Sequence, residues 1–312
     1  MRDQANATFN FMLRPLPPTA ANVCSVCLTF TEGWDTCWRC GHLTRFADAV
    51  LPISYSVAFG QLHTALRQYK RGHAFAARQF QLQLTAVLWR FLTLREGCLA
   101  RSVGVASFDL VTTDPSGSAE RDATHPLRRL IGELAAPTRT RYRRLLMRSG
   151  TPVAERAVDP GKYSPTTNLE GEAVLLIDDT WTTGANVQSA AGALKTSGAG
   201  AVGVLVVGRH INEDFGGNAQ RLRAVPRPFE WERCALHQYR LLGGGPGSLG
   251  VSLRWRISVR AVYAARASVA PAGAKGWLRV SMCQIASARR RAMSTWATLA
   301  PRCLPRRCLV CW

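Results

Sequence analysis

Hydrophobic residues along the chain form two kinds of pattern, short unbroken runs and longer stretches at helical spacing. The runs at 173–177 and 201–207 are free of charged residues, which is typical of strands buried on both faces of a parallel sheet. Apolar positions within 62–69, 74–94 and 187–194 recur with the period of a helix. Strands that alternate with helices predict an α/β fold around a central parallel sheet.

One stretch, AVLLIDDTWTTGANVQSAAGALKTSG at 173–198, predicts a strand, a turn and a helix in direct succession. Asp178 and Asp179 are expected to end the strand, because two adjacent carboxylates do not belong in a core. They would then project into the crevice beyond the strand ends, where open α/β sheets bind their ligands. The helix is expected over 185–196, with Gly198 in the cap that closes it.

The turn before this helix has the chemistry of a phosphate-binding site. Free backbone N–H groups at the start of a helix, the helix dipole and nearby hydroxyl groups together bind one phosphate. Asp178 and Asp179 can accept hydrogen bonds from ribose hydroxyls, directly or through Mg²⁺. The pattern favours a ribose 5-phosphate site; the alternative is an ordinary strand and helix with a capping acid pair. The expected ligand-binding residues of the turn are Thr182, Thr183, Gly184, Ala185 and Asn186.

A second loop is expected to take part in binding. The segment 108–112 predicts the first core strand, and a small loop that contains glycine follows it. Backbone N–H groups in such a loop can bind pyrophosphate, and the candidate residues are Thr113, Asp114 and Ser116. Because every strand is followed by a turn, an ordinary loop is an equally good interpretation.

Three other polar segments have two interpretations each. The arginine-rich segment 137–148 predicts a solvated helix face, or alternatively a cover over the pyrophosphate. The turn-rich segment 158–169 predicts a mobile lid or a connector, with Lys162 and Tyr163 as candidate contacts. The segment 208–212 predicts a loop whose polar residues either recognise an acceptor or are only solvated.

Four cysteines near the N-terminus have the spacing of a metal site. Cys24-x-x-Cys27 and Cys37-x-x-Cys40 are two pairs that can close tetrahedrally around a structural Zn²⁺, and a redox-active dithiol is the alternative. We find no secretory signal and no apolar run long enough for a bilayer. We therefore expect no membrane span and a reducing, cytoplasmic location.

Charge is distributed unevenly over the 312 residues. The net charge is +20, and 13 of the 40 basic residues, but none of the 20 acidic ones, lie in 234–312. Such a segment predicts disorder, although its arginines and tryptophans would also suit a nucleic acid. The expected organisation is a flexible arm (1–21), a zinc-binding module (22–46), an α/β domain (47–237) and a basic tail (238–312).

The motif LLIDDTWTTGAN at 175–186 resembles the 5-phosphoribosyl-1-pyrophosphate (PRPP) motif of type I phosphoribosyltransferases. It departs from the usual motif at Thr180, where an apolar residue is common, and at Asn186, where Ser or Thr is common. A four-cysteine module and a helix that ends in the pattern Leu-x-x-Tyr-Lys-x-Gly (66–72) precede it. In this combination the chain is similar to the competence-associated ComF family over about 24–234.

This resemblance implies a type I phosphoribosyltransferase-like fold that binds PRPP with Mg²⁺. Asp178 and Asp179 would then be the catalytic pair, and a nucleobase or an amine would accept the phosphoribosyl group. The biological setting would be nucleotide salvage or DNA uptake, with the uptake machinery or nucleic acid as a partner. The segment 121–127 departs from the Arg-Gly-Phe-Asn-like stretch of the family, which leaves the acceptor open. The alternative is a binding protein that senses PRPP or a nucleotide without catalysis.

Overall fold

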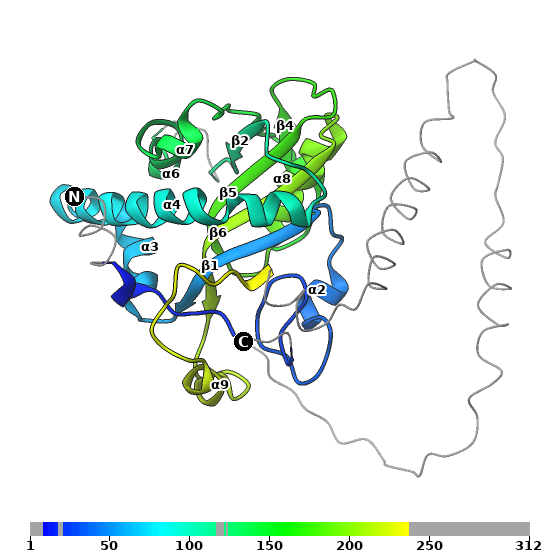
Figure 1. The fold of residues 1–312 in the computed structure, drawn as a ribbon. Helices are drawn as coiled ribbons and strands as arrows, with labels where there is room; N and C mark the ends of the chain where they lie inside the picture. The colour runs from blue at the N-terminus through cyan, green and yellow to red at the C-terminus, as the bar shows by residue number, and fades with distance from the viewer. Residues whose placement is uncertain (1–8, 18–20, 117–121, 123, 237–312) are drawn as a thin grey trace, which may run out of the picture. The chain divides into compact units, whose positions relative to one another are not determined.

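A parallel sheet of four strands lies at the centre of the fold, in the order β1-β6-β5-β2 (Figure 1). β6 pairs with β1 and β5, and β5 also pairs with β2. Because all pairs are parallel, the four strands end at the same edge of the sheet. The expected α/β fold with a parallel sheet is confirmed. The strands are β1 (Ala49–Val57), β2 (Leu110–Thr113), β5 (Ala173–Trp181) and β6 (Ala201–Ile211).

Part of the chain is described in the structure, which is a computed structural model. The basic tail at 238–312 and much of the arm at 1–21 lie outside the described residues. No helix of the described part combines the length and the hydrophobicity that a bilayer crossing requires. The described residues, all in one unit of the chain, are 9–17, 21–116, 122 and 124–236.

Helices cover both faces of the sheet. Residues of α3 and α4 share one hydrophobic core with Leu175 and Ile177 of β5, whereas residues of α8 share a second core with Val174 and Leu176. Consecutive residues of β5 therefore point to opposite faces, as the pleat of a strand requires. The helices are α3 (Gln61–Arg71), α4 (Ala74–Ser102) and α8 (Ala185–Thr196).

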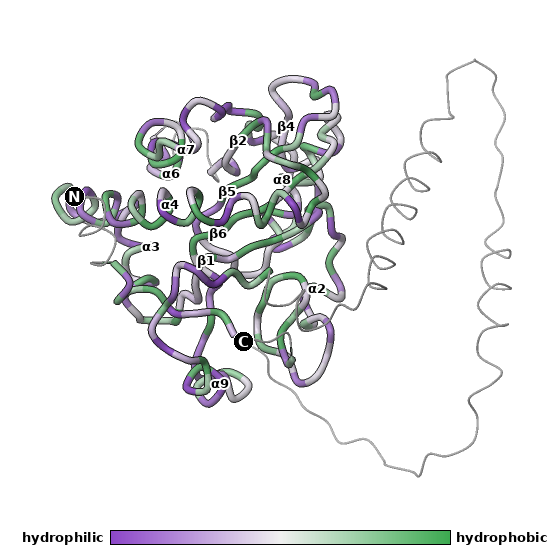
Figure 2. The backbone as a smooth tube through the Cα atoms, viewed as in Figure 1, coloured by the Kyte–Doolittle hydropathy of each residue, from purple (hydrophilic) through white to green (hydrophobic). Residues whose placement is uncertain are grey.

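The two helices of the first core follow the sequence pattern closely. α3 buries Leu62, Ala65, Leu66 and Tyr69, the face that its spacing predicts. α4 starts where predicted but continues to Ser102 instead of ending near 94. Figure 2 shows hydrophobic and hydrophilic positions alternating along α4, as expected of a helix with one buried face.

α8 spans the residues that the sequence predicts and closes with a Schellman motif. Gly198 has φ +108°, a conformation that favours glycine. The N–H of Gly198 donates to the carbonyl of Lys195, and the N–H of Ala199 donates to that of Leu194. A Cβ atom at Gly198 would also collide with the backbone of Leu169. This glycine therefore fixes both the end of α8 and the approach of the preceding segment.

β5 and β6 are longer than the sequence predicts. Asp178 and Asp179 were expected beyond the strand, but β5 continues through them to Trp181. Thr180 and Trp181 pair with Gly208 and Arg209 of β6, so the ladder between the two strands supplies the hydrogen bonds that extend both. The expected loop at 208–212 is consequently strand as far as Ile211.

The arginine-rich segment 137–148 is not a helix face, which corrects that expectation. Only its first residues belong to a helix, a turn follows at 140–141, and Tyr142 then bridges to Val111 of β2. The N–H of Val111 donates to the carbonyl of Arg141, and the N–H of Arg143 donates to that of Val111. The open edge of β2 thus holds this stretch in an extended conformation, which local helical spacing cannot reveal.

The turn-rich segment 158–169 contains regular structure as well. Its strand β4 pairs with β3 in a small antiparallel sheet that packs against α8. The remaining elements are η1 (Asn10–Met12), α2 (Trp38–His42), α6 (Pro126–Arg129), the π-helix η2 (Leu130–Leu134), α7 (Ala136–Arg139), β3 (Leu146–Arg148), η3 (Pro160–Lys162), β4 (Tyr163–Pro165) and α9 (Asn218–Ala224).

The cysteine-bearing segment is anchored to the α/β core by hydrogen bonds. The backbone N–H groups of Phe46 and Ala47 donate to Oε1 of Gln188 on α8, at 2.7 and 3.0 Å. The hydroxyl of Tyr55 on β1 donates to the carbonyl of Leu28 at 2.6 Å. Residues of this segment are therefore packed onto the sheet instead of forming a separate body.

Candidate functional site

Three aspartates gather where β2 and β5 approach the carboxyl edge of the sheet. Asp178 and Asp179 lie near the C-terminal end of β5, and Asp114 directly follows β2. Burial raises the pKa of Asp178 well above its usual range, and the negative charges of Asp114 and Asp179 raise it further. The pKa of Asp114 is about 6, raised first by burial and then by Asp179. The structure thus brings together three predicted site residues whose like charges repel one another.

Asp179 is held from α3. The hydroxyl of Tyr69 donates to its Oδ2 at 2.5 Å, and Nζ of Lys70 forms an ion pair with the same oxygen at 2.5 Å. Burial alone would lower the pKa of Lys70, but the carboxylates of Asp179, Asp178 and Asp114 outweigh burial and raise it. Asp179 is only 5% exposed, whereas Asp178 is half-buried. Asp178 is therefore the more accessible member of the pair.

Sequence reasoning did not assign Tyr69 and Lys70 to the site. Both belong to the pattern Leu-x-x-Tyr-Lys-x-Gly at 66–72, which carries part of the family resemblance. Their position at the C-terminal end of α3 was the available signal, since that end lies above the edge at which the strands terminate. The contact with β5 spans about 110 residues of sequence, so no local pattern could reveal it.

The turn between β5 and α8 is built around Gly184, which precedes the helix with φ +81°. A Cβ atom there would collide with the buried ring of Trp181. Thr183 Oγ1 accepts a hydrogen bond from the N–H of Ala185 at 3.4 Å. Thr182 is exposed and Thr183 is half-buried, and both precede the start of α8. Phosphate binding at this turn, with the first turn of the helix presented to the ligand, stays a prediction.

The side chain of a lysine lies beside this turn. Lys162 is 7% exposed, and its Nζ donates a hydrogen bond to Oδ1 of Asn186 in the first turn of α8. Burial and the neighbouring charge of Arg148 lower the pKa of Lys162, and Asp114 opposes them. A positive charge at the positive end of a helix dipole is unfavourable by itself. The arrangement is suited to an anion that would meet Lys162 and the helix start together.

Tyr163 connects the two halves of the site. Its hydroxyl lies 3.4 Å from Oδ2 of Asp114 and receives a long hydrogen bond of 3.4 Å from Arg148. Burial and the charge of Asp114 raise the pKa of Tyr163, so its proton is retained. Lys162 and Tyr163 were candidate contacts of a lid, and the structure places both next to predicted site residues.

In the described part of the loop after β2, polar groups of Ser116 and Thr113 contact other residues of the chain. The N–H of Ser116 donates to Oδ1 of Asp122 at 2.9 Å, so this amide is already used. Thr113 is buried, and its hydroxyl lies 3.3 Å from that of Tyr142. Asp122 is 1% exposed and also forms ion pairs with Arg128 and Arg144. Residues 117–121 lie outside the described part, so their contribution to binding stays a prediction.

The four predicted cysteine ligands converge. Their sulfur atoms all lie within 4.8 Å of one another, and among the described residues they are the only group of three or more such ligands that does so. The sulfurs of Cys27 and Cys37 are 3.8 Å apart, too far for a disulfide. A set of four thiols is the donor set of a closed tetrahedral site, so the cluster could hold a metal ion such as zinc. The four cysteines are Cys24, Cys27, Cys37 and Cys40.

Comparisons with protein-family models, with curated proteins and with solved structures found no match. The functional argument therefore rests on the geometry of this chain.

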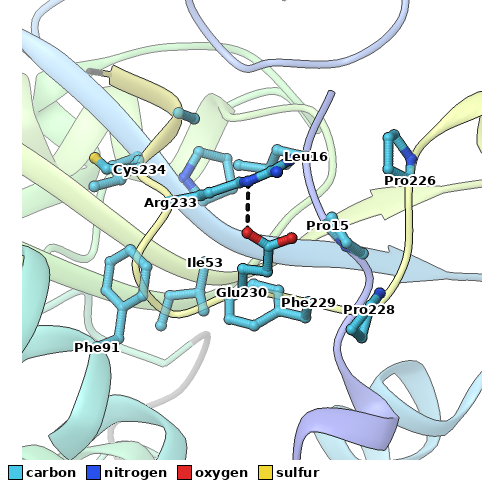
Figure 3. Close-up of a pocket in the computed structure, with 13 residues that line it drawn as sticks. Pro15, Leu16, Ile53, Phe91, Pro226, Pro228, Phe229, Glu230, Arg233 and Cys234 are labelled. Atoms are coloured by element: carbon cyan, nitrogen blue, oxygen red, sulfur yellow. Dashed lines mark ion pairs between the residues drawn. The ribbon is translucent and has the colours of Figure 1, made fainter. Parts of the chain in front are cut away.

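A small cavity beside β1 lies apart from the aspartates, the turn before α8 and the cysteines (Figure 3). Its volume is about 40 Å³, and it lies between the segment at 15–16 and the segment at 226–235, where Arg233 forms an ion pair with Glu230 at 2.6 Å. None of the predicted site residues lines it. The cavity has room for little more than water, so it offers no site for a phosphosugar.

Proposed function

We propose that this chain is a phosphoribosyltransferase-like protein that binds PRPP, or another ribose 5-phosphate ligand, with Mg²⁺ at the carboxyl edge of its sheet. The observation that carries the proposal is the position of Lys162 at the first turn of α8, next to Tyr163, whose hydroxyl lies 3.4 Å from Asp114 of the aspartate cluster. One side of the site is positive and the other negative. A ligand with a terminal phosphate and a vicinal diol would satisfy both sides at once.

The positive side would bind the 5-phosphate. Lys162, the hydroxyl groups of Thr182 and Thr183 and the amides of the first turn of α8 that follow Ala185 are suited to a phosphate dianion. Phosphate would relieve the repulsion between Lys162 and the helix dipole. Lys162 would then gain a negatively charged partner in direct contact. Among the described residues, the opposite charge that acts on it is that of Asp114, which forms no ion pair with it.

The negative side would bind the ribose. Asp178 is the accessible carboxylate, and it accepts a hydrogen bond from the N–H of Asp179 at 2.7 Å. Its remaining lone pairs can accept hydrogen bonds from ribose hydroxyls. Carboxylate oxygens are also the ligands that Mg²⁺ prefers, so Asp114 and Asp178 have the right chemistry for this ion. A bound cation would relieve the repulsion that raises the pKa of both groups.

In the catalytic form of this proposal, a nitrogen acceptor displaces pyrophosphate from C1 of the ribose. The C1–O bond breaks with its electron pair on pyrophosphate, the new C–N bond forms, and the acceptor gives up a proton. Positive charge develops on the sugar in the transition state, and the carboxylate of Asp178 opposes it. When bound, Mg²⁺ supplies positive charge to the pyrophosphate.

A second candidate is a binding protein that senses PRPP or a nucleotide without catalysis. The observation that favours it is the engagement of Asp179, whose Oδ2 is already held by Tyr69 and Lys70. The expected catalytic pair then offers one free carboxylate instead of two. Under either function, nucleotide salvage or DNA uptake in the cytoplasm is the proposed setting, and zinc is the proposed metal of the four cysteines.

Calorimetric titration with PRPP and Mg²⁺ tests both candidates for binding. We expect binding to the wild type, a loss for the double variant Asp178→Asn/Asp179→Asn, and no change for Asp214→Asn, an exposed residue outside the site. No binding to the wild type would refute both functions. A screen of nucleobases and amines for pyrophosphate release then separates them, since binding without release with any acceptor would contradict the enzyme.

A further inference from the structure

Helix α3 crosses the carboxyl edge of the sheet from β6 to β5. Near the start of the helix, the ring of His63 lies beside that of His210, close to the end of β6, with the ring centroids 5.3 Å apart. At the other end of the helix, Lys70 forms its ion pair with Asp179 of β5. One flank of α3 therefore lies along the edge at which the proposed ligand would bind.

Three basic residues form a row on this flank. His63, Arg67 and Lys70 are spaced by four and then three residues, so they follow one another along one side of the helix, over about 10 Å. The two ends of the row contact the strand ends. Arg67, in the middle, is exposed, and no ion pair of the described residues includes it. Its guanidinium is therefore available to an anionic group of a ligand.

The imidazole of His63 is held in one tautomer. The backbone N–H of Phe59 donates to its Nδ1 at 3.0 Å. Burial lowers the pKa of His63 and of His210, so both rings are uncharged at neutral pH. A neutral imidazole carries a single proton, so Nε2 of His63 is the N–H donor. This Nε2 makes no hydrogen bond with the described residues, which leaves it able to donate to a ligand.

Phe59 presents an exposed ring on a constrained turn. It is 87% exposed and has φ +61°, a conformation that is rare for a bulky residue. The N–H of Ala58 donates to the carbonyl of Ile211 at 2.8 Å, which ties the turn to the end of β6. The ring of Phe59 lies 6.1 Å from that of His63, at 76° to it. Strained backbone is concentrated at functional sites, and the exposed ring offers a face on which a planar molecule can stack beside His63.

We propose that Phe59, His63 and Arg67 bind the acceptor of the phosphoribosyl group, and that this acceptor is a planar aromatic acid with a nitrogen nucleophile. Its ring would stack on Phe59, Nε2 of His63 would donate a hydrogen bond to it, and Arg67 would pair with its carboxylate. The inference rests on the proposed function and names the substrate class of the same edge. Of the residues at 208–212 that were expected to recognise an acceptor, His210 would take part by packing against His63.

Calorimetric titration of the full-length protein with 2-aminobenzoate and with imidazole-4-carboxylate tests the ligand class, first without and then with PRPP and Mg²⁺. Each acid is compared with its uncharged carboxamide, and cyclohexanecarboxylate supplies the same charge without a planar ring. We expect at least one acid to bind, and its carboxamide and cyclohexanecarboxylate to bind at least about tenfold more weakly. Equal affinity for acid and carboxamide, or no binding of either acid under both conditions, would overturn the proposal.

Substitutions then test whether these three residues form the site. Arg67→Gln should weaken binding of the acid about tenfold and leave that of the carboxamide unchanged, because only the acid carries the charge. Phe59→Asn should weaken both. The matched controls are Arg78→Gln and Phe75→Asn, at exposed positions near the start of α4, and both should bind as the wild type does. Unchanged affinity for the acid in folded Arg67→Gln would refute the assignment.

The two proposals fail in different ways. A protein that binds PRPP but neither aromatic acid would refute the acceptor assignment and leave the proposed function standing. A protein that binds an aromatic acid through Phe59 and Arg67 but does not bind PRPP would refute the proposed function, and with it the role of the acid as an acceptor.

Discussion

Lys70 on α3 and Asp179 on β5 form an ion pair in which Nζ and Oδ2 are 2.5 Å apart. The hydroxyl of Tyr69 reaches the same oxygen at 2.5 Å, so two consecutive residues of α3 hold one carboxylate of the sheet. Asp179 is nearly inaccessible, whereas about a third of the Lys70 side chain remains exposed. The pair therefore joins α3 to β5 at the edge where the proposed ligand would bind.

The first prediction concerns this pair. Replacing Lys70 with Met leaves a buried carboxylate without its charge partner, which is costly even after allowance for the exposure of Lys70. We expect the free energy of unfolding of Lys70→Met to fall by about 2 kcal/mol in urea denaturation. The matched control is Arg129→Met, because Arg129 forms a surface pair with Glu133 at 3.5 Å. Equal losses in both variants would mean that the buried pair contributes no more to stability than a surface pair does.

The second prediction concerns the pH dependence of stability. The pKa of Asp114 is raised to about 6 by burial and by Asp179, from 3.8 for an ordinary aspartate. The folded protein therefore binds this proton more tightly than the unfolded chain does. Its contribution to stability is fully present below about pH 4 and is lost as the pH rises to about 6.

The side chain that Asp114→Asn introduces cannot ionise. Between pH 4 and pH 7, the free energy of unfolding of this variant should therefore fall by about 2 kcal/mol less than that of the wild type. Urea denaturation at several pH values between 4 and 7 measures the difference. Asp214→Asn, at an exposed position, should follow the wild type. If Asp114→Asn kept the full wild-type slope, the proton would have to belong to another group.

The third prediction separates binding from folding at Lys162. Burial lowers the pKa of this lysine, so its charge is unfavourable in the unliganded protein. We expect Lys162→Met to be as stable as the wild type or slightly more stable, yet to bind PRPP at least about tenfold more weakly, the effect of one charge-assisted hydrogen bond.

The control for Lys162 lies at the opposite end of the same helix. Lys195 forms an ion pair with Asp48 at 2.6 Å, far along α8 from the turn. Lys195→Met should lose some stability and keep its affinity for PRPP, as measured by calorimetry. Unchanged affinity in Lys162→Met would remove the main support for the phosphate position.

Local patterns predicted the elements whose ends are set locally. The bounds of α8 follow from its apolar spacing and from Gly198, whose positive φ closes the helix. The buried face of α3 follows from spacing alone. The convergence of the cysteines follows from two short motifs. In each case the residues that decide the structure are close together in the sequence.

The features that sequence reasoning missed depend on distant partners. β5 extends through two aspartates because β6 continues to pair with it. The stretch around Arg141 is extended because it bonds to β2, and Glu96 of α4 holds its guanidinium at 2.6 and 2.9 Å. Asp179 is buried because α3 supplies a lysine and a tyrosine. None of these partners can be located before the strand order is known.

The fourth prediction concerns the metal. Elemental analysis of the purified protein should find a single zinc ion per chain, and Cys27→Ser should lose it. Cys98→Ala should keep it, because Cys98 lies in the other core, away from the cluster. Acidification should release zinc from the wild type, since thiolates that take up protons no longer bind the ion. Full zinc content in Cys27→Ser would contradict the assignment.

The last prediction tests whether the turn must be as tight as the structure has it. Gly184 has φ +81°, and a Cβ atom there would meet the ring of Trp181, whereas Gly216 has φ +57° with no atom within 4 Å of an added Cβ. Alanine at Gly216 should cost only the backbone strain, about 1 kcal/mol. Alanine at Gly184 should cost about 1–3 kcal/mol more, because the ring of Trp181 has to move. The displaced ring would disturb the turn, so Gly184→Ala should also weaken PRPP binding while Gly216→Ala leaves it unchanged. Equal stability losses in the two variants would show that the ring of Trp181 moves aside at no energetic cost. The turn would then lack the rigidity that a preformed phosphate site requires.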